Sequence, residues 1–140
     1  MTIEEIKKDF KISTEIKVRY SDLDTLMHVN NAKYLSFLEE ARIDYIGKVL
    51  NFNRKKLEFG VVVARIEIDY KYPVFLTDHL EVYTRCSRIG TKSFTFDCVF
   101  VINDSKIAAI SKVVMVSVDI EGKTLEVPAL WKAGIEQFEQ

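Results

Sequence analysis

The residues best suited to chemistry are crowded into one short segment, SDLDTLMHVNN. It holds two carboxylates (Asp22 and Asp24), one imidazole (His28) and two amides (Asn30 and Asn31), and it directly precedes a run with helical apolar spacing. The N-terminus of a helix offers free backbone N–H groups and about half a unit of positive charge, which together stabilise an oxyanion. A carboxylate beside it can act as a nucleophile or as a general base toward water. The segment therefore predicts an active site, unless helix capping explains it.

Helix capping explains only part of the segment. One Asn or Asp at the N-cap satisfies one backbone N–H group, which accounts for Asn30 or Asn31. It does not account for Asp24, which comes well before them in the chain. Taken singly, each aspartate is more often a solvated surface group, and a lone histidine such as His28 is more often structural. Their combination with a helix N-terminus is what favours catalysis.

The same residue types suit one kind of substrate in particular, a thioester. Its leaving group is a thiolate whose parent thiol has a pKa of about 8.5, so it departs without a strong general acid. Ester or amide cleavage would need a dedicated proton donor, and the sequence offers no obvious Ser/His/Asp or Cys/His set. The residues therefore favour thioester hydrolysis.

Composition and charge exclude several other classes of protein. The 140 residues fit one domain that can bury a core, with no linker or repeat, so we expect a single domain over residues 1–140. A net charge of −1 gives no electrostatic case for binding nucleic acid or an anionic membrane. There is no secretory signal or membrane-spanning run, so we expect a cytoplasmic protein. Two cysteines and two histidines give no credible metal set, and we expect Cys86 and Cys98 to face the core as small hydrophobes.

Apolar spacing predicts one long helix and five strands. Apolar residues recur at steps of three and four over residues 31–50, which is typical of a helix with one buried stripe. Alternation with a period of two predicts strands, and the short connections between the last four lead us to expect antiparallel pairing of each with the next. The last strand is apolar on both faces over 113–118, which indicates a place in mid-sheet or at a subunit interface. The fold class is therefore α+β, with strands at residues 14–20, 61–70, 80–86, 94–102 and 107–119.

A wider segment, RYSDLDTLMHVNNAKYLSFLEEAR, resembles the signature of the hotdog-fold acyl-CoA thioesterases of the 4-hydroxybenzoyl-CoA thioesterase type. That signature is an aspartate, a short loop, H-V-N-N, and then Y-x-x-x-x-E-x-A-R on a helix. The match continues through IDYKYPVFLTDHLEV and RIGTKSF and covers residues 14–119. The segment DLDTLMHVNNAKYLSFLEE also looks like the corresponding part of acyl-ACP thioesterases. The resemblance implies a hotdog fold, in which a five-stranded antiparallel sheet wraps a long central helix, and an acyl thioesterase that needs no cofactor.

For catalysis, the resemblance implies that Asp24 is the family's catalytic carboxylate. The backbone N–H at Asn31 falls where the helix N-terminus polarises the thioester carbonyl. His28 matches the histidine proposed as catalytic in the acyl-ACP enzymes, although Leu26 stands where those enzymes carry Asn. Many relatives carry Gly immediately before the histidine, where this chain has Met27, so the loop is expected to turn differently.

For substrate binding, the resemblance implies that Tyr34 lines the acyl or pantetheine channel and that Asn30 braces the loop. Lys92 matches a basic position that contacts the nucleotide of CoA in some relatives. Because the turn around Lys92 is poor in positive charge, both acyl-CoA and acyl-ACP stay open as substrates. The family forms homodimers or homotetramers with each site between two subunits. No metal and no redox cofactor is implied.

Two other functions stay open at this stage. Hotdog-fold hydratases and dehydratases use a D-x-N-P-x-H pattern, whereas Asp24 and His28 are one residue too close here and the Asn-Pro is missing. A non-catalytic module that binds acyl thioesters would need the same tunnel, and the presence of Asp24 argues against it only weakly.

Overall fold

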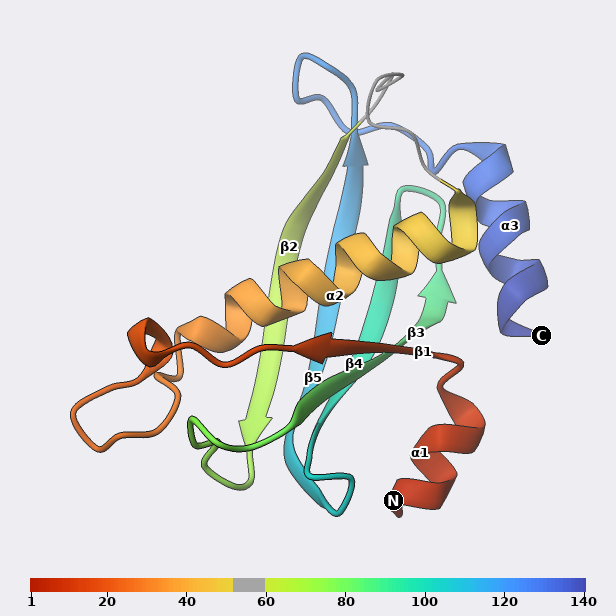
Figure 1. Ribbon diagram of the computed structural model, residues 1–140. Coiled ribbons are helices and arrows are strands. Elements are labelled where there is room, and N and C mark those ends of the chain that lie inside the picture. The colour runs from red at the N-terminus through yellow and green to blue at the C-terminus, as the bar shows by residue number, and fades with distance from the viewer. Residues whose placement is uncertain (52–59) are drawn as a thin grey trace.

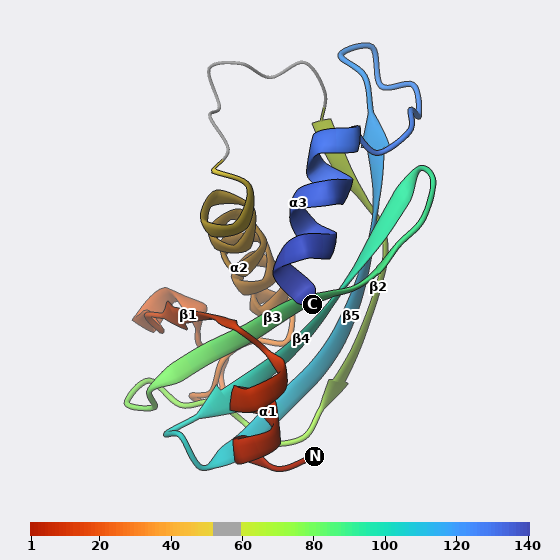
Figure 2. The same ribbon diagram turned by 90° about the vertical axis from the view of Figure 1, so that its right-hand side faces the viewer.

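The structure, a computed structural model that describes residues 1–51 and 60–140, is built on one five-stranded antiparallel sheet (Figure 1). Its strands are β1 (Ile12–Ile16), β2 (Gly60–Tyr70), β3 (Leu80–Ile89), β4 (Ser93–Ile102) and β5 (Lys106–Val118). Its helices are α1 (Ile3–Asp9), a 3-10 turn (Tyr20–Asp22), α2 (Lys33–Leu50) and α3 (Ala129–Glu139). α2 and α3 lie on the same side of the sheet (Figure 2). The predicted α+β architecture, a long helix wrapped by five antiparallel strands, is confirmed.

The strand order differs from the prediction at one connection. Across the sheet the order is β1-β3-β4-β5-β2, so β3, β4 and β5 follow one another as predicted. The prediction that β2 pairs with β3 is wrong, because β2 pairs with β5 at the sheet edge. The connecting segment 71–79 is held at the N-terminus of α2, where the Val74 carbonyl accepts a hydrogen bond from the Val29 N–H (2.8 Å). The connection therefore carries the chain across the sheet from one side to the other.

α2 forms because one stripe of its surface is apolar. The stripe is fully buried against the sheet, where Tyr45 packs on Phe96 and Tyr34 packs on Phe100, with ring centroids 4.6 and 5.1 Å apart. Such burial, rather than helix propensity, supplies most of the stability of a helix in a protein. Within the described residues, no helix is long and apolar enough to cross a membrane. The buried residues of α2 are Tyr34, Phe37, Leu38, Ala41 and Tyr45.

The double apolar character of residues 113–118 is explained by the position of β5 inside the sheet. β5 pairs with β4 on one side and with β2 on the other. Val113 and Met115 are buried beneath α2, while Val114 and Val116 on the opposite face are only partly buried. The mid-sheet placement is therefore found, and the subunit interface stays a prediction.

The boundaries of the first strand are shifted from those predicted. β1 begins earlier and its pairing with β3 ends at Ile16, opposite Leu80. The chain then leaves the sheet for the 3-10 turn, although Val18 remains buried. The strand predicted over residues 14–20 thus combines a short edge strand with an apolar residue that packs outside the sheet.

A bulge interrupts the alternation that the sequence predicts over β2. The register with β5 shifts between Val63 and Arg65, which leaves Ala64 as the extra residue. As a result Val61 and Ile66 pack with the core beneath α2, whereas Val62 is 48% exposed.

Two helices were not predicted. α1 covers the sheet face opposite α2, where Ile6 and Phe10 pack on Tyr83 and Val99. Its start carries a capping box between Thr2 and Glu5, a pattern that is readable in the sequence.

α3 closes the far end of the core beside the C-terminal half of α2. Trp131 and Ile135 are buried there. The Glu139 carboxylate accepts hydrogen bonds from the Tyr45 hydroxyl (2.5 Å) and from the Cys86 N–H (2.9 Å). This single carboxylate ties α3 to both α2 and β3.

Both cysteines are buried, as predicted, and we expect them to be inert. Burial raises the pKa of the Cys86 and Cys98 thiols to about 12, so both are neutral at pH 8 and lack the reactive thiolate. Because these folded-state pKa values lie above the unfolded value of 9.0, their contribution to stability is present below pH 9 and is lost as the pH rises toward 12. A disulfide exchange reagent at pH 8 should modify neither thiol until denaturant is added. Rapid modification of the folded protein would contradict this expectation.

Candidate active site

The loop between the 3-10 turn and α2 is a tight, hydrogen-bonded structure. Leu23 and Val29 form a β-bridge at its base, and the Asp24 N–H donates to the His28 carbonyl (2.9 Å). Met27 has a φ of 64°, in the left-handed region that glycine tolerates best. Met27, which stands where the family resemblance leads us to expect Gly, therefore has a backbone conformation that favours glycine.

The loop is anchored to the connection between β2 and β3. Besides the hydrogen bond from Val29 to Val74, His28 forms a bridge with Phe75, and their rings meet edge to face with centroids 6.2 Å apart. Residues that are distant in the sequence thus fix the position of the His28 imidazole.

The Asp24 carboxylate is held at the turn of this loop. Its Oδ1 accepts the Leu26 N–H (2.9 Å), an arrangement typical of Asx turns, and its Oδ2 lies 3.4 Å from Nδ1 of His28. The Asp24 and His28 side chains are both 27% exposed. The structure therefore brings these two predicted residues together, with the carboxylate still open to water.

The first turn of α2 leaves one backbone donor free. The Asn30 side chain accepts the Ala32 N–H (2.9 Å) in the turn that leads into α2. The N-cap position of α2 is Ala32, which has no side-chain capping hydrogen bond, so the predicted Asn cap is wrong by one or two residues. The N–H groups of Lys33, Tyr34 and Leu35 each donate to the carbonyl of the residue three positions earlier. Within the part of the chain that the structure describes, the Asn31 N–H donates to no partner. It is the donor available to a ligand.

Tyr70, the last residue of β2, orients this turn and was missed by the sequence analysis. Its hydroxyl donates to the Asn31 carbonyl (3.0 Å), and its ring meets that of Tyr34 edge to face with centroids 5.0 Å apart. Tyr34 is 2% exposed, and burial raises its pKa to about 12, so it stays neutral. No sequence signal connects the end of a strand with the start of a helix so much earlier in the chain.

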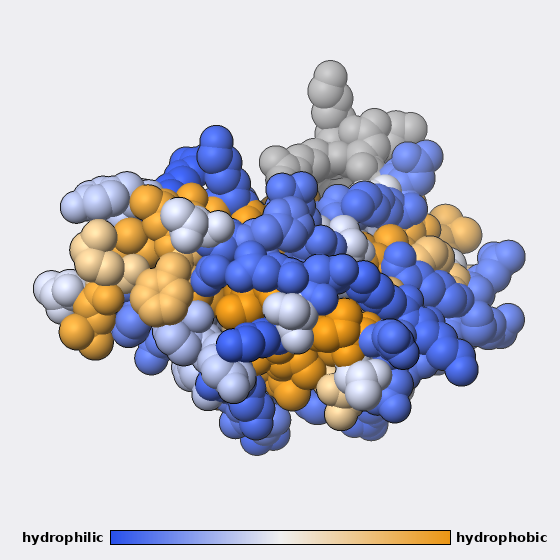
Figure 3. All heavy atoms as spheres, turned by 60° about the horizontal axis from the view of Figure 1, so that its bottom comes forward, coloured by the Kyte–Doolittle hydropathy of each residue, from blue (hydrophilic) through white to orange (hydrophobic). Residues whose placement is uncertain are grey.

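An open pocket of about 220 Å³ lies at this helix start. Figure 3 views this end of the molecule and shows apolar surface, toward the left, interrupted by hydrophilic side chains. Asp24 does not line the pocket and reaches it only through its neighbour His28. The lining residues are His28, Val29, Asn31, Tyr34, Tyr70, Lys71, Tyr72 and Pro73.

Two other candidate residues take different positions. Asp22 is buried, and its Oδ2 accepts the Arg19 N–H (2.8 Å), which gives it a structural role in the 3-10 turn. Lys92 accepts the Ser117 N–H through its carbonyl (3.0 Å), next to the start of β2, whereas the pocket is at the end of β2. Because each strand residue spans about 3.3 Å, Lys92 and the pocket are separated by about 30 Å along β2 within one chain.

The comparisons with known proteins agree on one family. The family model described as the thioesterase-like superfamily matches residues 18–135. The chain is 34% identical over 131 residues to the long-chain acyl-CoA thioesterase FadM of Escherichia coli K12, covering 92% of this chain and 98% of that protein.

Solved structures give the same result. A thioesterase from Thermus thermophilus, complexed with coenzyme A and Zn, superposes with a TM-score of 0.82 at 32% identity, over 94% of this chain and 96% of that one. The PA5185 protein of Pseudomonas aeruginosa PAO1 superposes with a TM-score of 0.85 at 21% identity, over 95% and 94%, which speaks for the fold alone. Within residues 1–51 and 60–140 of the present chain, no three His, Cys, Asp or Glu side chains gather to hold a metal ion.

We expect the Tyr70 hydroxyl to hold the first turn of α2 in place. Tyr70→Phe keeps the ring contact with Tyr34 but removes the hydrogen bond to the Asn31 carbonyl, a loss of about 1 kcal/mol. Amide hydrogen exchange at Tyr34 and Leu35 should then become about fivefold faster. Tyr20→Phe, at a ring that is 73% exposed, should leave that exchange unchanged. Equal exchange in both variants would show that the hydroxyl does not order the turn.

Proposed function

Because this chain belongs to the thioesterase-like superfamily, we propose that it hydrolyses acyl-CoA thioesters to a free acid and a thiol. Its relative FadM is named as a long-chain acyl-CoA thioesterase, and its relative from Thermus thermophilus was solved with coenzyme A. The hotdog fold implied by the sequence resemblance is confirmed.

The free Asn31 N–H is the observation that carries the proposal. It lies at the positive end of α2, in a residue that lines the pocket, and it has no protein partner among the described residues. A thioester carbonyl bound there would find a donor that is already oriented when negative charge develops on its oxygen. Tyr70 supports this role because its hydroxyl fixes the Asn31 carbonyl.

Asp24 is the group we propose to start the reaction. Its carboxylate either attacks the carbonyl carbon or removes a proton from the attacking water. In both cases the carbon–sulfur bond breaks and the thiolate departs without a strong general acid. His28, at 3.4 Å from the carboxylate, holds Asp24 toward the pocket that His28 itself lines.

Three further residues are proposed to bind substrate. Tyr34 is a buried, neutral aromatic wall of the pocket against which the acyl or pantetheine chain packs. Asn30 holds the turn before α2, and with it the pocket residue Asn31, because its side chain accepts the Ala32 N–H. Lys92 is too distant to act within its own chain, so its contact with the carrier, CoA or an acyl carrier protein, requires a second subunit.

The second subunit is proposed to pair along β2. This strand forms an open edge, with Val62 and Val63 exposed by 48% and 39%, and apolar edge strands are templates for further pairing. In an antiparallel pair of such edges, the start of β2 in one copy lies beside the end of β2 in the other. Lys92 of one subunit then approaches the pocket of its neighbour, and the pocket gains a second wall.

We expect Asp24→Asn to lower kcat for acyl-CoA by about a hundredfold or more, in line with the usual worth of one positioned base. The amide keeps the size of the side chain but removes its charge and its nucleophilic oxygen. The measurement is steady-state hydrolysis, with circular dichroism to confirm folding.

Asp22→Asn is the matched control. Because Asp22 is buried and accepts the Arg19 N–H, this change should lower the melting temperature while kcat of the folded enzyme stays within a few-fold. If Asp24→Asn retains full activity and Asp22→Asn does not, the assignment of the catalytic carboxylate is wrong.

Sedimentation velocity at micromolar concentration should show a particle larger than the 16.2 kDa of one chain. Val63→Lys places a charge on the exposed edge and should shift the protein toward the monomer and lower its activity in parallel. Ile120→Lys, at a side chain that is 85% exposed in a turn, should do neither. An unsubstituted protein that sediments as a folded monomer would exclude the shared site.

A further inference from the structure

The connection between β2 and β3, segment 71–79, supports the site loop and is itself held by the hairpin of β4 and β5. Near its start, the Tyr72 N–H donates to the Ala108 carbonyl of β5 (3.1 Å). Near its end, the Asp78 side chain meets that of Asn103, the residue that follows β4. Both ends of the connection are therefore fixed to one hairpin, at the lower end of the molecule in Figure 1.

The Asp78 carboxylate uses both of its oxygens to make this attachment. Its Oδ2 accepts the Phe75 N–H (2.8 Å), and the Asp78 N–H donates to the Phe75 carbonyl (3.1 Å), which closes a tight turn. Its Oδ1 accepts a hydrogen bond from the side-chain amide of Asn103 (2.8 Å). The amide oxygen of Asn103 in turn accepts the His79 N–H (2.9 Å). The two side chains thus link the hairpin to Phe75 by hydrogen bonds, and those to the carboxylate are of the stronger, charge-assisted kind.

Phe75 passes this attachment on to the candidate catalytic pair. Its backbone forms a β-bridge with His28, and its ring meets the imidazole edge to face with centroids 6.2 Å apart. The Phe75 side chain is 45% exposed, so packing in the core does not fix its position. The His28 imidazole lies 3.4 Å from the Asp24 carboxylate. Direct contacts therefore lead from Asp78 to the group that is proposed to start the reaction.

Asp78 acts from outside the pocket, because it is not one of the lining residues. The site loop depends on such outside support, since Met27 has a left-handed backbone that is unfavourable for a residue other than glycine. A reacting group that is misplaced by about 1 Å can cost a reaction about a hundredfold in rate, even when the change lies far from the chemistry. The turn that Asp78 closes is therefore placed to influence the rate without touching the substrate.

We propose that Asp78 is a positioning residue for thioester hydrolysis. Together with Asn103 it holds Phe75 against His28 and so keeps the Asp24 carboxylate directed at the bound carbonyl. The inference rests on the proposed function, because it concerns the support of the same catalytic pair. It gives the hairpin of β4 and β5, which supplies no candidate catalytic residue, a part in the reaction.

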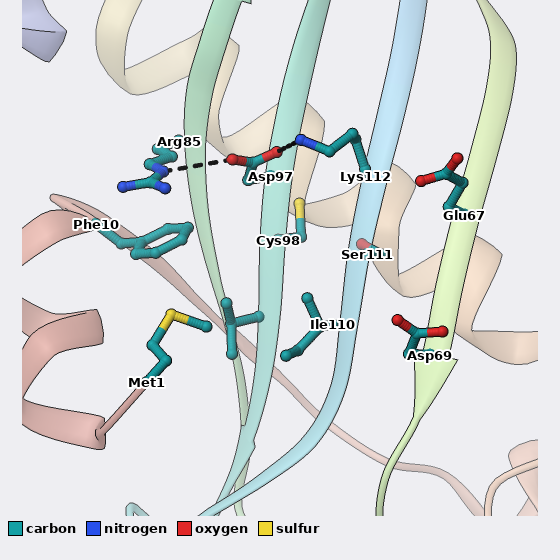
Figure 4. Close-up of a pocket in the computed structure, with 11 residues that line it drawn as sticks. Met1, Phe10, Glu67, Asp69, Arg85, Asp97, Cys98, Ile110, Ser111 and Lys112 are labelled. Atoms are coloured by element: carbon teal, nitrogen blue, oxygen red, sulfur yellow. Dashed lines mark hydrogen bonds and ion pairs between the residues drawn. The ribbon is translucent and has the colours of Figure 1, made fainter.

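A carboxylate with comparable partners but no contact with the site loop lies on the sheet face opposite α2. Figure 4 shows Asp97 of β4 between Arg85 and Lys112, with Nε and Nζ at 3.6 and 2.8 Å from its carboxylate oxygens. Like Asp78, Asp97 joins neighbouring strands through its side chain. It serves as the matched control, because its removal disturbs the sheet without reaching Phe75 or His28.

The first test is steady-state hydrolysis of acyl-CoA, with melting temperatures measured in parallel. Asp78→Ala removes both acceptors and should lower kcat by about tenfold or more, while KM stays unchanged because the pocket lining is intact. Asp97→Ala should leave kcat unchanged even where it lowers the melting temperature. A loss of kcat in Asp78→Ala that is no greater than in Asp97→Ala would show that Asp78 is not a positioning residue.

An exchange of the two polar side chains gives a sharper version of this test. Asp78→Asn alone opposes two amides and Asn103→Asp alone opposes two carboxylates, so each should lower kcat. In Asp78→Asn/Asn103→Asp the hydrogen bond between the side chains can form in the reverse direction, and both backbone N–H groups keep an oxygen acceptor. Asn and Asp both tolerate the left-handed backbone at position 103, where φ is 52°. The double variant should therefore regain most of the kcat that the single variants lose.

Amide hydrogen exchange follows the loop without any hydrolysis. The Val29 N–H, which donates to the Val74 carbonyl, should exchange about tenfold faster in Asp78→Ala and at the original rate in the double variant and in Asp97→Ala. If the unsubstituted protein hydrolyses no acyl thioester but exchange follows this pattern, the proposed function fails and the support of the loop by Asp78 stands. If Asp78→Ala leaves exchange at Val29 unchanged, Asp78 does not hold the loop and the inference is wrong.

Discussion

Every α-helix begins with backbone N–H groups that have no carbonyl in a preceding turn, and the start of α2 is organised around that constraint. The Asn30 side chain satisfies one donor, and tight-turn carbonyls satisfy the next three. Among the described residues, only the Asn31 N–H of this turn is left open, and the Asn31 carbonyl accepts a hydrogen bond from the Tyr70 hydroxyl. A donor that a folded protein normally has to satisfy is in this way left open to a ligand, and it is the donor that we propose for the reaction.

The two aspartates of the same segment show how environment separates their roles. Asp22 is buried, accepts a backbone N–H and approaches Lys33 to 3.9 Å, so it is committed to the 3-10 turn. Asp24 keeps one oxygen beside His28 and stays open to water. Asp22 and Asp24 carry the same carboxylate and lie two residues apart. Because only Asp22 enters the core, its role is structural, and Asp24 is left as the proposed catalytic carboxylate.

The sequence predicts what depends on local pattern and fails where distant segments meet. Alternation and helical spacing were enough for the long helix, the five strands and the grouping of Asp24, His28 and Asn31 at the mouth of α2. Spacing could not place β2 at the edge beside β5, because a connection of nine residues can reach a neighbouring strand or pass across the whole sheet. It could not find Tyr70 for the same reason. Lys92 was suggested by family resemblance alone, and only the sheet reveals its distance from the pocket.

The anchoring of the site loop has a consequence for the order of folding. The backbone hydrogen bonds within α2 join residues that are close in sequence, whereas the loop owes its shape to Val74 and Phe75, far along the chain. Contacts of that separation form late, because a long segment must be closed before they stabilise anything. The left-handed backbone of Met27 is unfavourable until those partners arrive. In a refolding chain, the loop that carries Asp24 and His28 would therefore reach its final shape only after the segment with Val74 and Phe75 has docked beside it.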